Sequence, residues 1–420
     1  MEMKRAIAAL LLTTSWAGVA AAADRAAVVE TYADIAEATY GDSLATAVAL
    51  QKAVEALIAS PSADSLQAAR AAWTEARAYY QQSEVFRFGN PVVDAWEGKV
   101  NAWPLDEGLI DYVDVSYGES EENPLAAANV IASPKIEVAG QEIDASVITP
   151  DLIAGALHEA DGVDANVASG YHAIEFLLWG QDLNGTGPGA GARPYTDYLQ
   201  GEGCTGGNCD RRAAYLQAAT DLLVSDLSYM AGAWAPAGEA RGVVTATPEA
   251  GLLAMLTGLG SLSYGELAGE RMKLGLLLND PEEEQDCFSD NTYNSHYYDG
   301  IGMRNVLTGH YARADGTEVT GPSLLDLLKE ADGTLAGELE GQINGTVAAL
   351  GAIKAAAEGG MAYDQMLAPG NKQGEALIGG GIEALVAQTA TIERAVGVLG
   401  LSAVDFEGSD SLDNPGAVFQ

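Results

Sequence analysis

The stretch that decides the fold is residues 378–399, IGGGIEALVAQTATIERAVGVL. Its larger side chains recur at alternating steps of four and three residues, which is the spacing of one face of an α-helix. An apolar face on a helix this long predicts a bundle helix that packs against several neighbours. The face consists of Ile378, Ile382, Leu385, Thr389, Ile392, Val396 and Leu399.

The same pattern recurs towards the N-terminus, within residues 62–86. Leu66, Ala69, Trp73, Ala76 and Tyr80 lie at helical steps and predict a second amphipathic helix. Further helices are predicted near residues 24–59, 150–179, 211–234, 249–278, 322–335 and 336–358.

Strand signals are few and short. Residues 136–143 alternate around Ala139-Gly140, and residues 312–320 surround Asp315-Gly316, so both predict small β-hairpins. The fold class predicted from the sequence is therefore all-α, with short β-hairpins on a helical body.

A glycine-rich segment divides the helical pattern. Residues 180–209 contain nine glycines, a composition typical of a linker. The sequence thus predicts two helical-bundle halves, at 24–190 and 205–420. Gly170 and Glu175 in the first half can be aligned with Gly265 and Glu270 in the second, which leaves an internal duplication open.

Residues 1–23 have the features of a secretory signal peptide. Lys4 and Arg5 precede an apolar run at residues 6–19, and Ala21-Ala22-Ala23 forms a cleavage site before Asp24. No later run reaches the apolar length of a membrane span, so we expect no transmembrane span. The sequence predicts a protein exported to the periplasm or the cell surface.

The composition excludes one broad class of partner. Lys and Arg total 21 against 60 Asp and Glu, for a formal net charge of −39. A nucleic-acid-binding protein needs a basic surface, so no nucleic-acid partner is expected. Such a negative field attracts cations, but solubility or adaptation to a salty habitat is the simpler explanation of the charge.

The cysteines point to a disulfide. Cys204 and Cys209 lie close together in the glycine-rich segment, and in an oxidising compartment they can form a bridge that leaves Cys287 single. Neither C-x-x-C nor C-x-x-C-H occurs, so redox-motif and covalent-haem interpretations have no support.

His172 and Glu175 are the strongest candidates for chemistry. They lie three residues apart on a predicted helix, so the imidazole and the carboxylate can approach one atom. Nitrogen and oxygen ligands suit iron or zinc. Two ligands are too few for a metal site, so a further ligand must come from another segment. H-x-x-E spacing also arises by chance, and from the spacing alone a capped or solvated pair is the simpler interpretation.

Other signals are weaker. His158-Glu159 begins a zincin motif, but Gly162 stands where the second histidine is required. A polar cluster at residues 286–296 predicts loop capping or further ligands. Glu107, Asp111 and Asp114 predict a solvated acidic face.

Four segments in the same order resemble the imelysin family, in its iron-regulated protein A-like branch. The motif G-x-H-x-x-E occurs at Gly170, His172 and Glu175, and the resemblance extends over roughly residues 30–400. The other three segments are SEVFRFG at 83–89, NAWPLDE at 101–107 and CFSDNT at 287–292.

The resemblance implies two helical-bundle halves with the motif near their interface, in an exported protein of iron acquisition. His172 and Glu175 match the family motif directly. We expect them to bind a divalent or ferric metal ion, with iron as the first choice and zinc as the second. The implied partners are the metal ion or an iron chelate, and an iron-transport protein of the cell envelope.

Three more metal ligands are predicted from this sequence alone. Glu270 follows from the alignment of the two halves, and Asp290 and His296 follow from the polar cluster. The alternative function is a metallopeptidase that uses the same His172 and Glu175, with Glu175 as the general base. The family carries a peptidase label, whereas this sequence contains no complete peptidase motif, so the sequence leaves enzymatic activity open.

Overall fold

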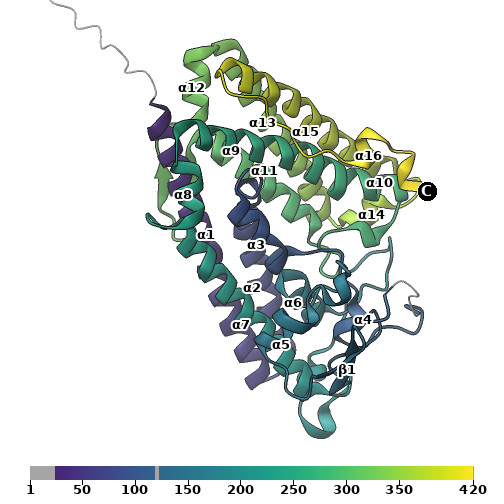
Figure 1. Cartoon of the computed structure of the whole chain (residues 1–420). Coiled ribbons are helices and arrows are strands. Elements are labelled where there is room, and N and C mark those ends of the chain that lie inside the picture. The colour runs from purple at the N-terminus through teal and green to yellow at the C-terminus, as the bar shows by residue number, and fades with distance from the viewer. Residues whose placement is uncertain (1–23, 119–122, 420) are drawn as a thin grey trace, which may run out of the picture.

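The N-terminal bundle is built around one long helix. The computed structural model describes residues 24–118 and 123–419, and the predicted signal peptide at 1–23 lies outside these residues. Helix α1 (Arg25–Ala59) packs along α2 (Ala63–Gln81) and α7 (Cys209–Trp234), as Figure 1 shows. Ser62 starts α2 with a capping box, because its hydroxyl accepts from the backbone of Ser65, whose hydroxyl accepts in return.

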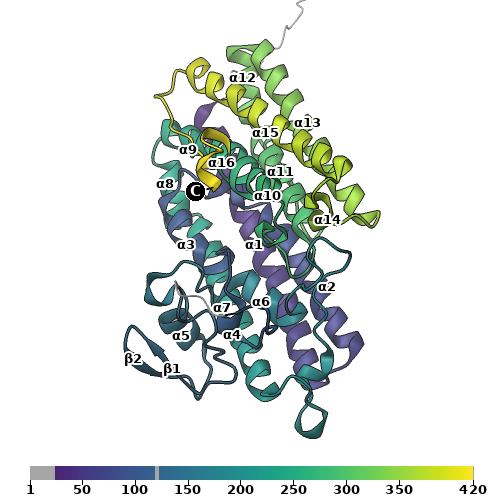
Figure 2. The ribbon, with the colours of Figure 1, turned by 90° about the vertical axis from the view of Figure 1, so that its right-hand side faces the viewer.

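The C-terminal bundle lies above the first in Figure 2 and consists of antiparallel helices. Its central pair, α13 (Gly333–Glu358) and α15 (Lys372–Val398), packs on α11 (Thr292–Thr308). Helix α9 (Pro248–Ser261) runs through a π-helical segment (Leu262–Lys273) into α10 (Leu274–Leu278). All seven residues of the apolar face predicted at 378–399 are buried.

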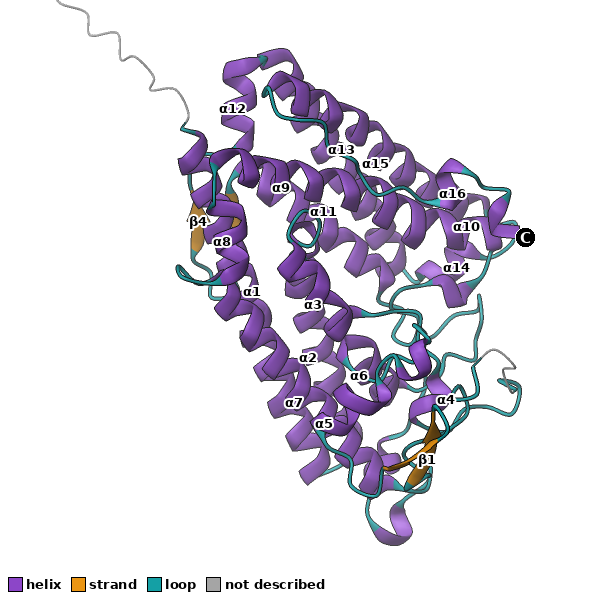
Figure 3. Ribbon diagram, in the orientation of Figure 1, coloured by secondary structure: helices purple, strands orange, loops and turns teal. Residues whose placement is uncertain are grey.

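Within the part of the chain that the structure describes, the strands form two hairpins, drawn in orange in Figure 3. β1 (Lys135–Val138) pairs antiparallel with β2 (Gln141–Asp144), and β3 (His310–Ala312) pairs with β4 (Glu318–Thr320). The all-α prediction with two short hairpins is confirmed. The shorter helices are α3 (Pro91–Asn101), α4 (Glu107–Ile110), α5 (Pro150–Leu152), α6 (Gly170–Trp179), α8 (Glu239–Thr245), α12 (Leu324–Ala331), α14 (Tyr363–Leu367) and α16 (Asp410–Asp413).

Helix α7 packs with the N-terminal bundle, although the predicted division at 190 and 205 places it in the C-terminal half. This helix follows the glycine-rich segment, yet it packs on α1 and α6 of the N-terminal bundle. Helix α9 packs both on α1 and α8 and on α15, so the contacts mark no sharp boundary between the two bundles. The division at 190 and 205 stays a prediction about separable domains.

The single helix predicted near 150–179 is wrong. The chain forms α5, one π-helical turn (Ile153–Leu157) and a loop before α6 begins. Within this loop Glu159, Asp161 and Gly162 have positive φ angles. That left-handed conformation ends a helix, and propensity counted along the sequence does not reveal it.

The prediction of a solvated acidic face is wrong for two of its three residues, because Glu107 is buried and so is Asp111. The Asp111 carboxylate accepts from Arg193 at 2.7 Å and from Arg212 at 2.6 and 2.9 Å. Although burial alone raises the pKa of a carboxyl, the two guanidinium groups hold the pKa of Asp111 below its ordinary value. Asp111 therefore ties α4 to the glycine-rich segment and to α7.

The predicted disulfide is present. Cys204 and Cys209 form a disulfide, and Cys287 is a free thiol.

Within residues 24–118 and 123–419, no single helix has both the length and the apolar character to cross a membrane. One bent pair, residues 209–245 with 248–278, meets both criteria together.

Candidate metal centre

Helix α6 carries the first two candidate ligands, and a glycine determines where it starts. Gly170 has a φ of +80°, and a Cβ at this position would lie 2.6 Å from the carbonyl carbon of Val100 at the end of α3. Only glycine combines that conformation with such a close approach. The glycine of the G-x-H-x-x-E segment thus sets α6 directly against α3, with all ten residues of α6 buried.

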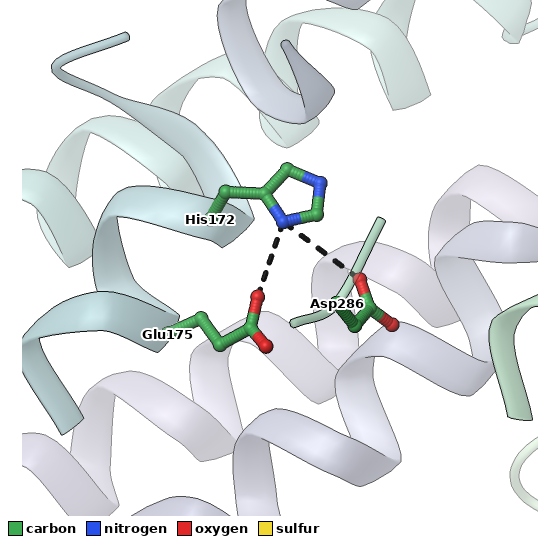
Figure 4. Close-up of side chains that lie close together, drawn as sticks. All are labelled: His172, Glu175 and Asp286. Carbon is green, nitrogen blue, oxygen red and sulfur yellow. Dashed lines mark hydrogen bonds and ion pairs between the residues drawn. The ribbon is translucent and has the colours of Figure 1, made fainter. Parts of the chain in front are cut away.

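His172 and Glu175 meet on one face of α6, as the spacing predicts. The His172 Nδ1 atom lies 3.1 Å from Glu175 Oε2 (Figure 4). The other oxygen, Glu175 Oε1, accepts from the backbone N–H of Ser289 at 2.9 Å and from its hydroxyl at 2.6 Å. A residue from the C-terminal half therefore orients the carboxylate.

Asp286 supplies a third donor from the loop before α11. Its Oδ1 atom lies 3.7 Å from His172 Nδ1 (Figure 4). One donor atom from each of His172, Glu175 and Asp286 lies within 4.8 Å of the others, and all three residues are 0% exposed. Asn291 donates to Asp286 Oδ2 at 3.0 Å, and the Ser295 hydroxyl donates to the same oxygen. We call His172, Glu175 and Asp286 the HED cluster.

A buried guanidinium lies against the HED cluster. Arg77 of α2 donates to Asp286 Oδ1 from Nε at 3.0 Å and lies 2.9 Å away through a terminal nitrogen. The same terminal nitrogen lies 3.2 Å from His172 Nε2. Its other terminal nitrogen donates to Asn101 Oδ1. The guanidinium of Arg77 therefore supplies the positive charge beside the carboxylate of Asp286.

The contact with Arg77 determines the tautomer of His172. A guanidinium has donors and no acceptor, so Nε2 of His172 must accept. A neutral imidazole then carries its proton on Nδ1, which donates to Glu175 Oε2.

Burial and charge shift the pKa values of the HED cluster in different directions. Burial, together with the nearby Arg77, lowers the pKa of His172 to about 3, so the ring is neutral near pH 7. Burial and the carboxylate of Asp286 raise the pKa of Glu175 well above its ordinary value. Burial opposes ionisation of Asp286, but Arg77, His172 and the Ser295 hydroxyl together outweigh it and hold the pKa of Asp286 below its ordinary value.

The three remaining predicted ligands lie outside the HED cluster. Glu270 is exposed and borders a separate cavity beside Arg271. Asp290 is half-buried and has one buried oxygen without a hydrogen-bond partner. His296 is 0% exposed, and among the described residues neither of its ring nitrogens has a hydrogen-bond partner. The ring packs edge-on against Tyr363, with ring centroids 5.1 Å apart.

Sequence reasoning missed Asp286 and Arg77. Asp286 directly precedes the family-like segment at 287–292 and stands first in the polar cluster at 286–296. The sequence thus indicates this loop, but the residues predicted from it are Asp290 and His296. Arg77 stands one residue after Ala76 of the stripe on α2. A charge at that edge of an apolar face is itself a signal of a buried counter-charge.

The four family-like segments converge around this centre. Asn101 of the second segment accepts from Arg77, and Ser289 of the fourth donates to Glu175. Glu84 of the first segment pairs with Arg271 at 2.7 Å. Gln81, in the amide orientation that satisfies its neighbours, accepts from Arg77 at 2.8 Å and donates to Asp299, which is itself an ion-pair partner of Arg271. A continuous polar network thus joins the two bundles through their cores.

Two cavities flank the loop at Trp103-Pro104 and approach the HED cluster. One, of about 440 Å³, is bordered by Asn101 and Gln285, which adjoin Arg77 and Asp286 respectively. The other, of about 410 Å³, is bordered by Cys287 and Phe288. Both cavities therefore border sequence neighbours or hydrogen-bond partners of the buried cluster.

Sequence comparison connects the chain to proteins linked with iron. A model of the imelysin family (Peptidase_M75) matches residues 36–392. Iron-regulated protein A from Synechococcus elongatus is 36% identical over 72 residues, which cover 17% of this chain. The match spans only 20% of the length of that relative.

Two solved structures share the fold. A protein from Parabacteroides distasonis described as an iron-regulated protein A precursor matches with a TM-score of 0.63 and 21% identity, over 89% of this chain and 94% of that one. An imelysin-like protein from Psychrobacter arcticum matches with a TM-score of 0.58 and 15% identity, over 91% of this chain and 99% of that one.

Proposed function

This chain belongs to the imelysin family, and we propose that it is an exported protein of iron acquisition that binds an iron ion as cargo at the HED cluster. The observation that carries the proposal is the convergence of His172, Glu175 and Asp286 from two distant segments into one buried group of donors within 4.8 Å. The names of the iron-regulated relatives support iron rather than zinc as the cargo.

The donor set fits a transition metal. One imidazole and two carboxylates suit ferrous or ferric iron, and carboxylate oxygen suits the harder ferric ion best. Because the pKa of His172 is about 3, its ring nitrogens need not lose a charge before binding. Ser289 orients Glu175, and Asn291 and Ser295 orient Asp286, as the hydrogen-bonded neighbours of metal ligands commonly do.

Arg77 occupies the position of a counter-charge at the HED cluster, so an iron ion must compete with it. In the structure its guanidinium neutralises Asp286 and contacts His172 Nε2. An iron ion can bind His172 through Nδ1 only if the ring proton moves from Nδ1 to Nε2. Nε2 then carries a hydrogen and can no longer accept a hydrogen bond from Arg77. We infer that the ion takes over the counter-charge role of Arg77, and that Arg77 moves away when the ion binds.

Burial argues against the alternative function, a metallopeptidase at the same residues. A peptidase must bring a peptide bond to its metal and keep a position open for water. His172, Glu175 and Asp286 are 0% exposed, and the flanking cavities border their neighbours rather than the three donors themselves. An ion can pass where an extended polypeptide cannot.

The variant Glu175→Gln separates the two functions. With Glu175 as a ligand, replacing an anionic oxygen by a neutral amide should weaken iron binding by roughly ten- to a hundredfold, because hard cations favour anionic oxygen. Anaerobic titration with Fe²⁺ at fixed salt, beside a metal-dependent peptide-cleavage assay, measures both properties. The matched control is Glu270→Gln, which removes an exposed carboxylate and should leave iron binding unchanged.

The peptidase function makes the opposite prediction. With Glu175 as the general base, the parent would cleave peptide, and Glu175→Gln would abolish cleavage while the metal stays bound. That outcome would overturn the proposal.

Export and an envelope partner belong to the same proposal. The basic start, the apolar run and Ala21-Ala22-Ala23 support a signal peptide that is cleaved before Asp24. The mature protein would then exchange iron, as the ion or a chelate, with an iron-transport protein of the envelope. N-terminal sequencing of protein from the cell envelope should begin near Asp24, and recovery of the protein only with Met1 would contradict export.

A further inference from the structure

A second group of carboxylates gathers at the loop that carries Asp286. Asp182, Glu282, Glu284 and Asp364 all border one small cavity, and we call them the acidic pocket. They come from three segments: the stretch after α6, the loop before α11, and the first turn of α14. None of the three donors of the HED cluster borders this cavity.

Two of these carboxylates are buried without partners. Glu284 is 1% exposed and Asp364 is 2% exposed. Among the described residues, neither oxygen of either side chain has a hydrogen-bond partner within 3.5 Å. The Thr292 hydroxyl near Glu284 and the backbone N–H of Gln365 near Asp364 lower the pKa of each carboxyl, but burial outweighs them. Within residues 24–118 and 123–419, no ion pair joins any of the four acidic-pocket residues to a basic side chain. A buried carboxylate in this state is costly, and proteins ordinarily pair it or coordinate it to a metal.

The electrostatics of the acidic pocket agree with this description. Burial, with the nearby carboxylate of Asp182, raises the pKa of Asp364 to about 6. Burial and the carboxylates of Asp364 and Asp182 raise the pKa of the neighbouring Asp290 to about 7. The acids repel one another, so a cation between them would relieve both the repulsion and the missing contacts.

We propose that the acidic pocket is a second cation site, selective for a hard divalent ion of the Ca²⁺ class, that fastens the loop at 281–290 to α14 and to the segment after α6. The proposal does not rest on iron binding at the HED cluster. It assigns a role to the acid run before α11.

The shape and the donors favour Ca²⁺ over other ions. All four side chains offer carboxylate oxygen, which hard cations prefer. The cavity is about 10 Å³, room for about one water-sized particle. Mg²⁺ keeps several waters when it binds, whereas Ca²⁺ accepts many carboxylate oxygens in a flexible geometry. The four carboxylates are less tightly gathered than the HED cluster, so the side chains must turn inward around the ion.

The shared loop gives this site a structural consequence. Glu284 lies two residues before Asp286, and Ser289, which orients Glu175, follows in the same loop. A cation at Glu284 and Asp364 would therefore hold in place the segment that completes the HED cluster.

The test is calorimetric titration of the full mature chain with Ca²⁺, Mg²⁺ and Na⁺ at fixed ionic strength, with melting temperatures measured alongside. The key variant, Glu284→Gln/Asp364→Asn, replaces two carboxylates by amides of the same shape. The charge-matched control is Glu137→Gln/Asp151→Asn, which removes two exposed carboxylates elsewhere. A third variant, His172→Ala, removes a donor of the HED cluster only.

We expect Ca²⁺ to raise the melting temperature of the parent, the charge-matched control and His172→Ala. The Glu284→Gln/Asp364→Asn variant should bind Ca²⁺ about a hundredfold more weakly and melt at or above the ion-free parent, which shows that it folds. Failure of Ca²⁺ to bind the parent, or equal binding by this variant, would overturn the proposal. Loss of Ca²⁺ binding in His172→Ala would also overturn it, by placing the ion at the HED cluster.

Discussion

His172→Ala is expected to abolish iron binding, and His296→Ala to leave it intact. Removal of the only nitrogen donor of the HED cluster leaves two carboxylates, one of which is already paired with Arg77. Loss of even a hydrogen-bonded neighbour of a ligand costs 10- to 100-fold in metal affinity, so loss of the ligand itself should cost roughly a hundredfold or more.

His296 is a closely matched control. Both histidines are 0% exposed, and burial lowers the pKa of each to about 3. Truncation of either ring leaves a cavity of the same kind and a similar cost in stability. They differ in surroundings, because His172 contacts Glu175 and Arg77, whereas both ring nitrogens of His296 lack a hydrogen-bond partner.

Anaerobic titration with Fe²⁺, beside urea denaturation of both variants, separates binding from stability. Equal loss of iron binding in the two variants, or retained binding in His172→Ala, would contradict the assignment of His172 as a ligand.

Arg77→Met is expected to have opposite effects on stability and on iron binding. Without iron, the variant should be less stable than the parent by about 3–5 kcal/mol, because Asp286 is left as a buried carboxylate without its cation. At pH 8 the variant should bind iron about tenfold more tightly, because the ion no longer displaces a competing positive charge. Methionine keeps much of the packing of Arg77 against Tyr80 and Tyr171.

The control for charge is Arg77→Lys. Lysine keeps one positive charge but not the planar fork that reaches Asp286, His172 and Asn101 together, so its iron affinity should stay near that of the parent. Urea denaturation with and without iron measures the stability difference, and titration measures affinity. Weaker iron binding by a folded Arg77→Met variant would instead make Arg77 part of the binding site.

The helices could be predicted because their evidence is local. The apolar steps at Leu66, Trp73 and Tyr80, and those from Ile378 to Leu399, depend only on the period of the α-helix, and these residues are buried as predicted. The segment at 150–179 failed because a few positive φ angles outweigh average propensity over a long window. No periodic pattern carries that information.

The candidate site could be predicted only in part, for a similar reason. His172 and Glu175 share one helical turn, so their spacing is sufficient to bring them together. Asp286 and Arg77 arrive from distant segments, and only the packing of α2, α6 and the loop before α11 selects them over Glu270 or Asp290. Asp111 makes the same point, because an acid that looks solvated in sequence is buried between two arginines.

Iron binding at the HED cluster is tested most directly by anomalous diffraction at the iron edge from crystals of the iron-loaded mature protein. We expect one strong peak within coordination distance of His172, Glu175 and Asp286, with Arg77 turned away from His172 Nε2. Iron bound only at surface carboxylates, or a peak that leaves Arg77 in contact with both His172 and Asp286, would contradict this expectation.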